Sequence, residues 1–251
     1  MKYLQEIKNI VDKGNSETIK EVINELIYIE KSKATQEAFD YIIKNTSGTV
    51  RIQTFAKGEY YLDRKLYQEN LNFVTSRSDR LKILGISKYA YLYPEEFIEN
   101  WNTRPRVRWH LLHSIPDKSL KKDDDWFEWM EESLLYSLNK VDERIFSLIN
   151  STILNCSNDV REEYARAFWA DSRVLDQMKD DKHRPVINSL SENPFIDFKT
   201  AEYLILKHKT PSIRISIANH ARDNELLQII WESTKSEQIR KAVSNNPHFR
   251  G

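Results

Sequence analysis

The chain has 251 residues, which is enough to bury a sizeable core, and its 38 basic residues balance its 38 acidic residues. This balance excludes a global positive field of the kind that holds nucleic acid. With only 5 glycines and 7 prolines, the chain also lacks the frequent turn signals of an all-β protein. The one cysteine, Cys156, excludes an internal disulfide and cannot form a metal site alone.

The N-terminal segment Met1–Lys8 carries charges where a signal peptide has an apolar core. No apolar run in the sequence approaches the ~20 residues that span a bilayer. We therefore expect a cytoplasmic protein that does not bind to or enter a membrane.

Apolar residues recur at helical spacing along almost the whole chain, beginning with Leu4, Ile7, Ile10 and Val11. Clear strand alternation is absent, so the sequence predicts an all-α fold of about 14 to 16 short helices. Several residues mark helix starts: Pro94 at a first turn, Asp159 with Glu162 as a capping box, and Asp197, Thr210 before Pro211, and Asp223 as caps.

An arginine recurs near the start of every second predicted helix. Neighbouring members of the series stand about one period apart, except that Arg161 is about two periods from the arginine on either side of it. One period after Arg161, position 187 carries isoleucine instead. We expect each arginine to pack its stem along a neighbouring helix and to reach a carbonyl or carboxylate with its head. The series consists of Arg51, Arg80, Arg108, Arg161, Arg214 and Arg240.

Three segments in the last third of the chain repeat one another, namely Val186–Pro194, Ile213–Ala221 and Ile239–Pro247. Their starts are almost evenly spaced, and the interval falls in the range of roughly 20–50 residues that is typical of stacked repeats. The second and third segments resemble the leucine-rich repeat variant, a relative of the HEAT and armadillo repeats. That family's unit carries a V-R-x-x-V-A-x-N-P stretch and then a leucine-rich helix, here Leu226–Trp231.

The resemblance implies an α-solenoid of HEAT-like helix pairs, which we expect to be right-handed and to form one helical repeat domain over 1–251. N-terminal helices would occupy 1–45, degenerate repeats 46–183 and clear repeats 184–251. The chain departs from the family's pattern at Ala221, which stands in place of proline, and at Ile187, which stands in place of arginine.

Charge changes sign in the middle of the chain. Residues 77–122 hold ten basic and five acidic residues, whereas residues 123–163 hold eleven acidic and three basic residues. This distribution fits a bipolar surface for a partner, a short positive groove for a phosphate backbone, or simply a solvated helix face.

Within the basic stretch, aromatic and basic residues alternate closely. Tryptophan and arginine are frequent anchors of protein interfaces, and aromatics among arginines also suit stacking on bases. The alternative is that these tryptophans are core wedges between repeats. The predicted partner-binding residues are Trp101, Arg104, Arg106, Arg108, Trp109, His110 and His113.

No cofactor or metal site is expected from the sequence. His110 and His113 lie three residues apart on a helix, but no third ligand stands at a suitable spacing. The glycines are isolated, so no phosphate-binding loop is present.

We therefore expect a non-enzymatic interaction module, such as an adaptor, an inhibitor or an immunity-type protein, that grips a protein partner along its concave face. The alternative is a nucleic-acid-binding HEAT-like protein, in its sharper form a DNA glycosylase of the alkylated-base type. Its candidate residues would be Trp169 and Asp171, or Trp126 and Trp129 beside Asp123–Asp125.

The last predicted helix needs a cover for Ala242 and Val243, because a repeat stack requires a polar cap at its end. The cover could be another copy of the chain, which would make an oligomer. It could also be the preceding repeat, or a part of a longer protein.

Overall fold

The computed structural model describes residues 2–116, 126–208 and 210–251, and the prediction of an all-α fold is confirmed there. These residues form seventeen α-helices and three short 3-10 helices and contain no strand. The number of α-helices exceeds the 14 to 16 expected. Contacts divide the chain into two compact units, Met1–Ile115 and Pro116–Gly251, and we describe each unit on its own.

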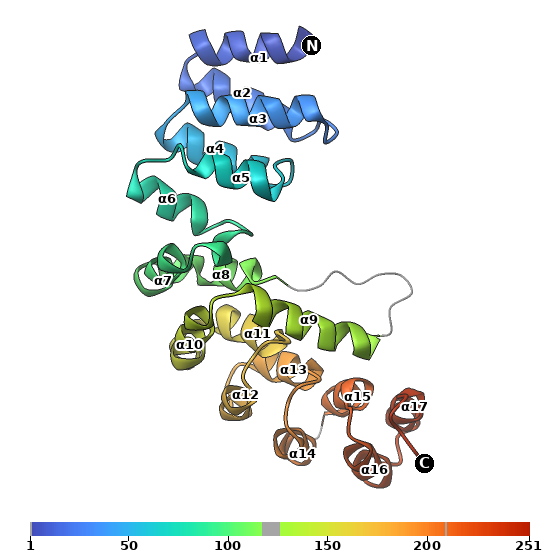
Figure 1. Cartoon of the computed structure of the whole chain (residues 1–251). Coiled ribbons are helices and arrows are strands. Elements are labelled where there is room, and N and C mark those ends of the chain that lie inside the picture. Colours follow the sequence, from blue (N-terminus) through green and yellow to red (C-terminus); the bar gives the residue numbers. More distant parts are fainter. Residues whose placement is uncertain (1, 117–125, 209) are drawn as a thin grey trace. The chain divides into compact units, whose positions relative to one another are not determined.

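Unit 1 is built from helices that pack against the second helix along the chain. α1 packs on α3 and α3 on α5, while α2 packs on α4 and α4 on α6 (Figure 1). The core therefore lies between two rows, with Leu26, Phe39 and Ile42 fully buried in it. The elements are α1 (Lys2–Lys13), α2 (Ser16–Leu26), α3 (Lys33–Asn45), α4 (Gly48–Gly58), α5 (Arg64–Leu71), α6 (Arg77–Leu84), η1 (Ala90–Leu92), α7 (Pro94–Thr103), η2 (Pro105–Val107) and α8 (Arg108–Ser114).

Helices of unit 2 also pack against the second helix along the chain. α11, α13, α15 and α17 form one row in which each helix packs on the next, and α14 packs on α16 beside it. The elements are α9 (Trp126–Lys140), α10 (Glu143–Thr152), η3 (Ile153–Asn155), α11 (Asn158–Arg166), α12 (Ser172–Met178), α13 (Arg184–Glu192), α14 (Phe198–Lys207), α15 (Pro211–His220), α16 (Asn224–Glu232) and α17 (Glu237–Asn245).

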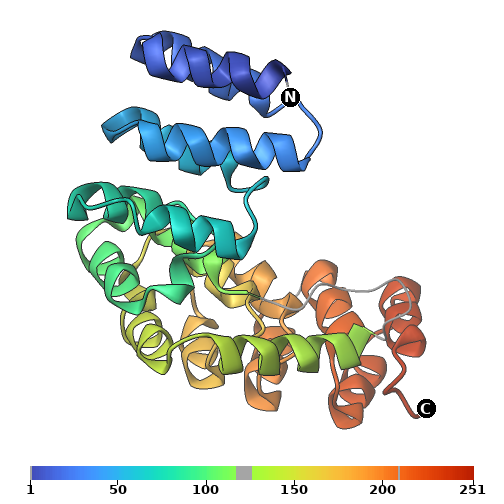
Figure 2. The same ribbon diagram turned by 45° about the horizontal axis from the view of Figure 1, so that its top comes forward.

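The long helix α9 lies across the turns that follow α11 and α15 (Figure 2). Its Trp129 ring meets Phe168 edge-on at 5.3 Å between centroids, and its Glu131 pairs with Arg222. Phe195 links these two contacts, because its ring lies 6.2 Å from Phe168 and 5.6 Å from the Arg222 guanidinium carbon. Positions 168, 195 and 222 follow one another at equal intervals along the chain, so α9 lies beside equivalent positions after α11, α13 and α15.

Aspartates precede the helices α12, α14 and α16 of unit 2. Asp171, Asp197 and Asp223 accept backbone N–H groups of α12, α14 and α16, which satisfies donors that a helix start otherwise leaves free. The predicted capping box at Asp159 is wrong. α11 begins at Asn158 after Ser157, which places Asp159 inside the first turn, where a hydrogen bond from the Ser157 side chain lowers the pKa of Asp159.

All six arginines of the recurring series donate to a carbonyl in the last turn of an earlier helical segment or just past its end, as the sequence predicted. Such carbonyls lack intrahelical partners, and a cation is favourable at this negative end of a helix. We call these residues the arginine ladder. The contacts are Arg51 to Ile43 at 2.9 Å, Arg80 to Leu71 at 3.1 Å, Arg108 to Trp101 at 2.8 Å, Arg161 to Cys156 at 2.6 Å, Arg214 to Ile205 at 3.4 Å and Arg240 to Thr234 at 3.0 Å.

Two buried asparagines join neighbouring repeats of unit 2. Asn193 donates from Nδ2 to the carbonyls of Ala165 and Ala167, at 2.9 Å each, and accepts the Phe195 N–H. The equivalent position between them, 220, carries no asparagine. Asn246 makes the same three contacts, with the carbonyls of Ala218 and Ala221 at 2.8 and 2.9 Å and with the His248 N–H.

The final helix α17 is covered from within the chain. Ala242 and Val243 are buried, and α17 packs on α15 and α16. Beyond the helix, the Phe249 ring stacks at 5.3 Å on Trp231 of α16. The preceding helices α15 and α16 therefore supply one of the three covers considered from the sequence.

We predict that Arg161→Met lowers the free energy of unfolding by about 2–3 kcal/mol, because it leaves the Asp181 carboxylate without its cationic partner. Arg161 donates to both Asp181 oxygens, at 2.7 and 3.1 Å, and only 9% of the Asp181 side chain is exposed. Urea denaturation at neutral pH measures the effect. Arg173→Met is the matched control, because that arginine also pairs with an aspartate but is 87% exposed, so we expect a change within about 0.5 kcal/mol.

The stability lost in Arg161→Met should also depend on pH. Burial alone would raise the pKa of Asp181, but hydrogen bonds from Arg161 and from the His183 N–H hold it below its usual value. The ion pair therefore stabilises the fold fully above the unfolded pKa of about 4, and this contribution vanishes as the pH falls through the folded pKa. A difference between Arg161→Met and the wild type that stays constant down to acid pH would contradict this assignment.

Candidate functional site

The structure separates the seven predicted partner-binding residues into two groups. Trp101 is fully buried and stacks on Phe97, with ring centroids 6.2 Å apart. Arg108 donates to the Trp101 carbonyl and lies over its ring at 5.4 Å. Arg104 donates to the carbonyl of Leu81 at 2.8 Å and to Asn100 Oδ1 at 3.0 Å. These three residues hold α6, α7 and α8 together.

The other four residues lie at the surface of η2 and α8, and we call them the α8 patch (Arg106, Trp109, His110 and His113). Arg106 and both histidines are exposed, and Trp109 keeps 37% of its surface in solvent. The Trp109 ring centroid lies 3.8 Å from that of His113 and 5.1 Å from that of His110. His113 Nδ1 lies 2.9 Å from the Trp109 carbonyl. The patch is therefore a group of three touching aromatic rings beside one cation.

The sequence allowed for a positive groove that binds phosphates. The feature of unit 1 that comes closest to such a groove is a shallow hollow of about 320 Å³. Arg77, Lys82 and Arg104 line it, together with Ser78 and Leu81. Acidic neighbours balance much of this charge, because Arg77 pairs with Glu99 and Lys82 lies 3.8 Å from Asp79. The predicted change of charge sign falls between residues 122 and 123, which lie outside the described residues.

The residues named for base-excision chemistry have structural contacts. Asp171 caps α12 and pairs with Arg173 at 2.9 Å, and this hydrogen bond is the main reason that its pKa lies below the usual value. The Trp169 ring packs against Phe146 and Tyr164. Trp129 packs against Phe168. Asp123–Asp125 and the side chain of Trp126 lie outside the described residues.

No group of three or more His, Cys, Asp or Glu side chains is placed to hold a metal within residues 2–116, 126–208 and 210–251. Cys156 is buried there, and its thiol lies 3.6 Å from the Thr152 carbonyl. No helix of these ranges combines the length and apolar character that crossing a bilayer requires.

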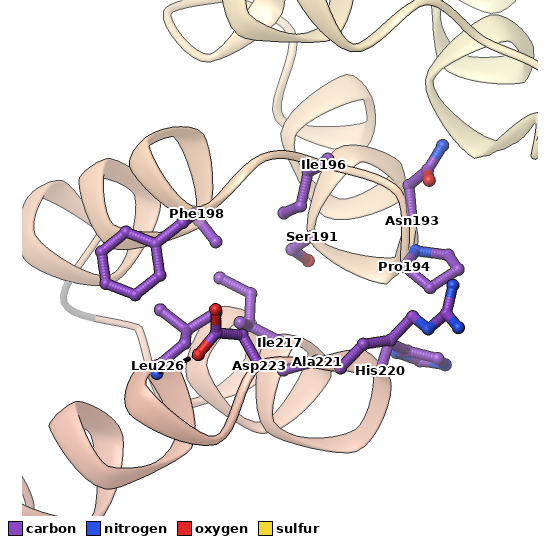
Figure 3. Close-up of a pocket in the computed structure, with 12 residues that line it drawn as sticks. Ser191, Asn193, Pro194, Ile196, Phe198, Ile217, His220, Ala221, Asp223 and Leu226 are labelled. Atoms are coloured by element: carbon purple, nitrogen blue, oxygen red, sulfur yellow. Dashed lines mark hydrogen bonds between the residues drawn. The ribbon is translucent and has the colours of Figure 1, made fainter. Parts of the chain in front are cut away.

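Two cavities lie where the repeat pattern is interrupted, and the sequence analysis did not select either one. The first has about 170 Å³ and opens between the α13–α14 and α15–α16 segments (Figure 3). Ile196, Phe198, Ile217 and Leu226 give it apolar walls, and the Asp223 carboxylate stands at its side. His220, which also lines it, occupies the position that carries Asn193 and Asn246 in the neighbouring repeats.

The second cavity has about 230 Å³ and is lined in part by Ile187. Ile187 stands at the position where the arginine ladder would have its next arginine. The signal for both sites was present in the sequence as two departures from an otherwise regular repeat. No protein-family model matches this chain, and neither a curated protein nor a solved structure was found to match it.

We predict that His220→Asn stabilises unit 2 by about 1 kcal/mol through one further bridge between repeats. The amides of Asn193 and Asn246 reach backbone carbonyls about one period earlier in the chain. By the same spacing, an amide at position 220 would face the backbone carbonyls of Glu192 and Pro194. His220 instead directs Nδ1 to the Ser216 carbonyl of its own helix at 2.8 Å. The urea midpoint measures the gain.

Two controls test the explanation. His220→Ala removes the imidazole without supplying an amide and should bring no gain. Asn193→Ala should cost about 2 kcal/mol, because it leaves buried backbone groups without partners. If His220→Ala stabilises as much as His220→Asn, the bridge is not the cause.

Proposed function

We propose that the chain is an α-solenoid of HEAT-like helix pairs, forming one repeat domain over 1–251, that binds a protein partner without catalysis in the cytoplasm. The repeated role of the arginine ladder supports the repeat architecture. Arg51, Arg80 and Arg108 of unit 1 and Arg161, Arg214 and Arg240 of unit 2 all serve helix ends.

One observation carries the choice of a protein partner over a polyanion. In the predicted site, the heads of Arg104 and Arg108 donate to the carbonyls of Leu81 and Trp101. The exposed part that remains is mainly aromatic, with Trp109 packed against His113 and His110. A partly exposed tryptophan beside an arginine is the composition of an interface anchor, whereas a phosphate backbone requires a row of accessible cations.

The proposal predicts that Trp109→Ala weakens partner binding at least about thirtyfold, the loss expected of an interface anchor worth about 2 kcal/mol. The partner is first isolated from the native host with wild-type protein as bait, and its dissociation constant is then measured by calorimetry. Tyr28→Ala is the matched control, because Tyr28 is an 87% exposed aromatic of the same unit. Circular dichroism checks that both variants fold.

Two outcomes are informative. A partner that is lost with Trp109→Ala and kept with Tyr28→Ala supports the α8 patch. A partner that binds wild-type protein and Trp109→Ala equally would move the interface away from the patch.

The alternative function, nucleic-acid binding, rests on the hollow lined by Arg77, Lys82 and Arg104. We expect no measurable binding of duplex DNA even at low salt, because Glu99 and Asp79 offset two of these charges. Fluorescence anisotropy over a salt series provides the test. Binding whose logarithm falls linearly with the logarithm of salt concentration would favour the alternative, and release of an alkylated base would favour its glycosylase form.

A further inference from the structure

The arginine ladder is interrupted at Ile187, and the space left there has a distinct chemistry. Ile187 stands on α13 one period after Arg161 and one period before Arg214. The cavity beside it measures about 230 Å³ and has Ile187 and Ile213 as an apolar floor. At about 30 Å³ per water molecule, the space equals roughly eight waters, which suffices for a small charged group with a substituent.

Two cations without acidic partners line this cavity. Lys182 and Arg184 are both exposed, and neither makes an ion pair within the described part of the chain. Asp181 also lines the space, but its carboxylate accepts two hydrogen bonds from Arg161 and one from the His183 N–H. Its charge is therefore matched by Arg161, and the lining carries a net positive charge.

Backbone dipoles add to this field. α13 and α15 begin beside the cavity after His183 and Thr210, and neither of these N-cap residues caps its helix with its side chain. Pro185 and Pro211 each remove one N–H donor from these first turns, so the two helix starts contribute to the site mainly through the positive end of the helix dipole.

His208, one of the residues that line the cavity, has a buried ring nitrogen without a partner. Nε2 of His208 is shielded from solvent and makes no hydrogen bond to any described residue. A buried polar group in this condition costs free energy. Beside it, the Thr210 hydroxyl is a further donor at the same wall.

We propose that this cavity binds the phosphoryl group of a small molecule. Two unpaired cations and two helix N-termini match a dianion better than a single carboxylate, and three acceptor oxygens can use the several donors of the wall. The floor of Ile187 and Ile213 would receive an apolar substituent of the same ligand. The site does not depend on the α8 patch, which lies in unit 1.

The test is calorimetric titration of the full chain with inorganic phosphate and with phenyl phosphate, at matched ionic strength against chloride. Saturable binding of phosphate is expected, with tighter binding of phenyl phosphate because of the apolar floor. Amide NMR of the same titration should show the largest shifts in α13 and α15 near Arg184 and Ile213.

Removal of the two cations should weaken binding specifically. Lys182→Ala with Arg184→Ala is expected to raise the dissociation constant at least about tenfold, equal to about 1.4 kcal/mol. The matched control is Lys235→Ala with Lys241→Ala, which removes the same net charge from exposed positions elsewhere in unit 2. The control should bind phosphate like the wild type.

Ile187→Arg distinguishes a shaped site from diffuse attraction. The variant restores the ladder arginine and adds a positive charge, so an unstructured electrostatic effect would tighten phosphate binding. A site inside the cavity predicts the opposite, because the new side chain fills the space. Circular dichroism confirms folding before the titration.

Three results would overturn the proposal: no saturable heat with either phosphate, equal losses in the double variant and its control, or tighter binding by Ile187→Arg. None of them bears on partner binding through Trp109, so the two proposals fail separately.

Discussion

The hydrogen bond from an arginine to a carbonyl at or near the end of an earlier helix is the interaction on which the packing of this protein depends. Even the longest helix, α9, has only 15 residues, and helices this short are marginal alone, so their ends must find partners and their apolar faces must be covered. A guanidinium does both, since its stem packs along the neighbouring helix while its head serves the free carbonyl. In two repeats the same group also lies over a tryptophan of the helix that it caps, Arg108 over Trp101 and Arg240 over Trp231.

This constraint changes how the basic and aromatic residues of the chain are interpreted. Arginine and tryptophan are typical of binding surfaces, yet in a stack of short helices they are also the materials of the scaffold. Arg104, Arg108 and Trp101 lie next to the α8 patch in the sequence but belong to the packing of unit 1. What remains at the surface is smaller and more aromatic than the sequence suggested, which favours recognition by shape and apolar contact over recognition by charge.

The sequence predicted those features that follow from a regular spacing of residue types along the chain. Helical spacing indicated the all-α fold, the recurring arginines indicated their own contacts, and Asp197 and Asp223 indicated helix starts. It failed where two residues of similar propensity compete, as at Ser157 and Asp159, because only the backbone position decides which of them precedes the first turn. The two cavities were also missed. A missing side chain leaves no pattern of its own, and Ile187 and His220 gain meaning only when the contacts of Arg161, Arg214, Asn193 and Asn246 are known.

Where the arginine ladder lacks an arginine, at position 187, the neighbouring helices would be expected to move together, because empty space in a protein interior is costly. At Ile187 the contacts on both sides oppose this. Arg161 holds the turn before α13 through both oxygens of Asp181, and Arg214 reaches the carbonyl of Ile205 near the end of α14. The helix starts that flank the gap are thus held from outside it, so the space beside Ile187 stays open. The recurring contacts hold neighbouring helices together, and the two cavities described above lie at positions where such a contact is absent.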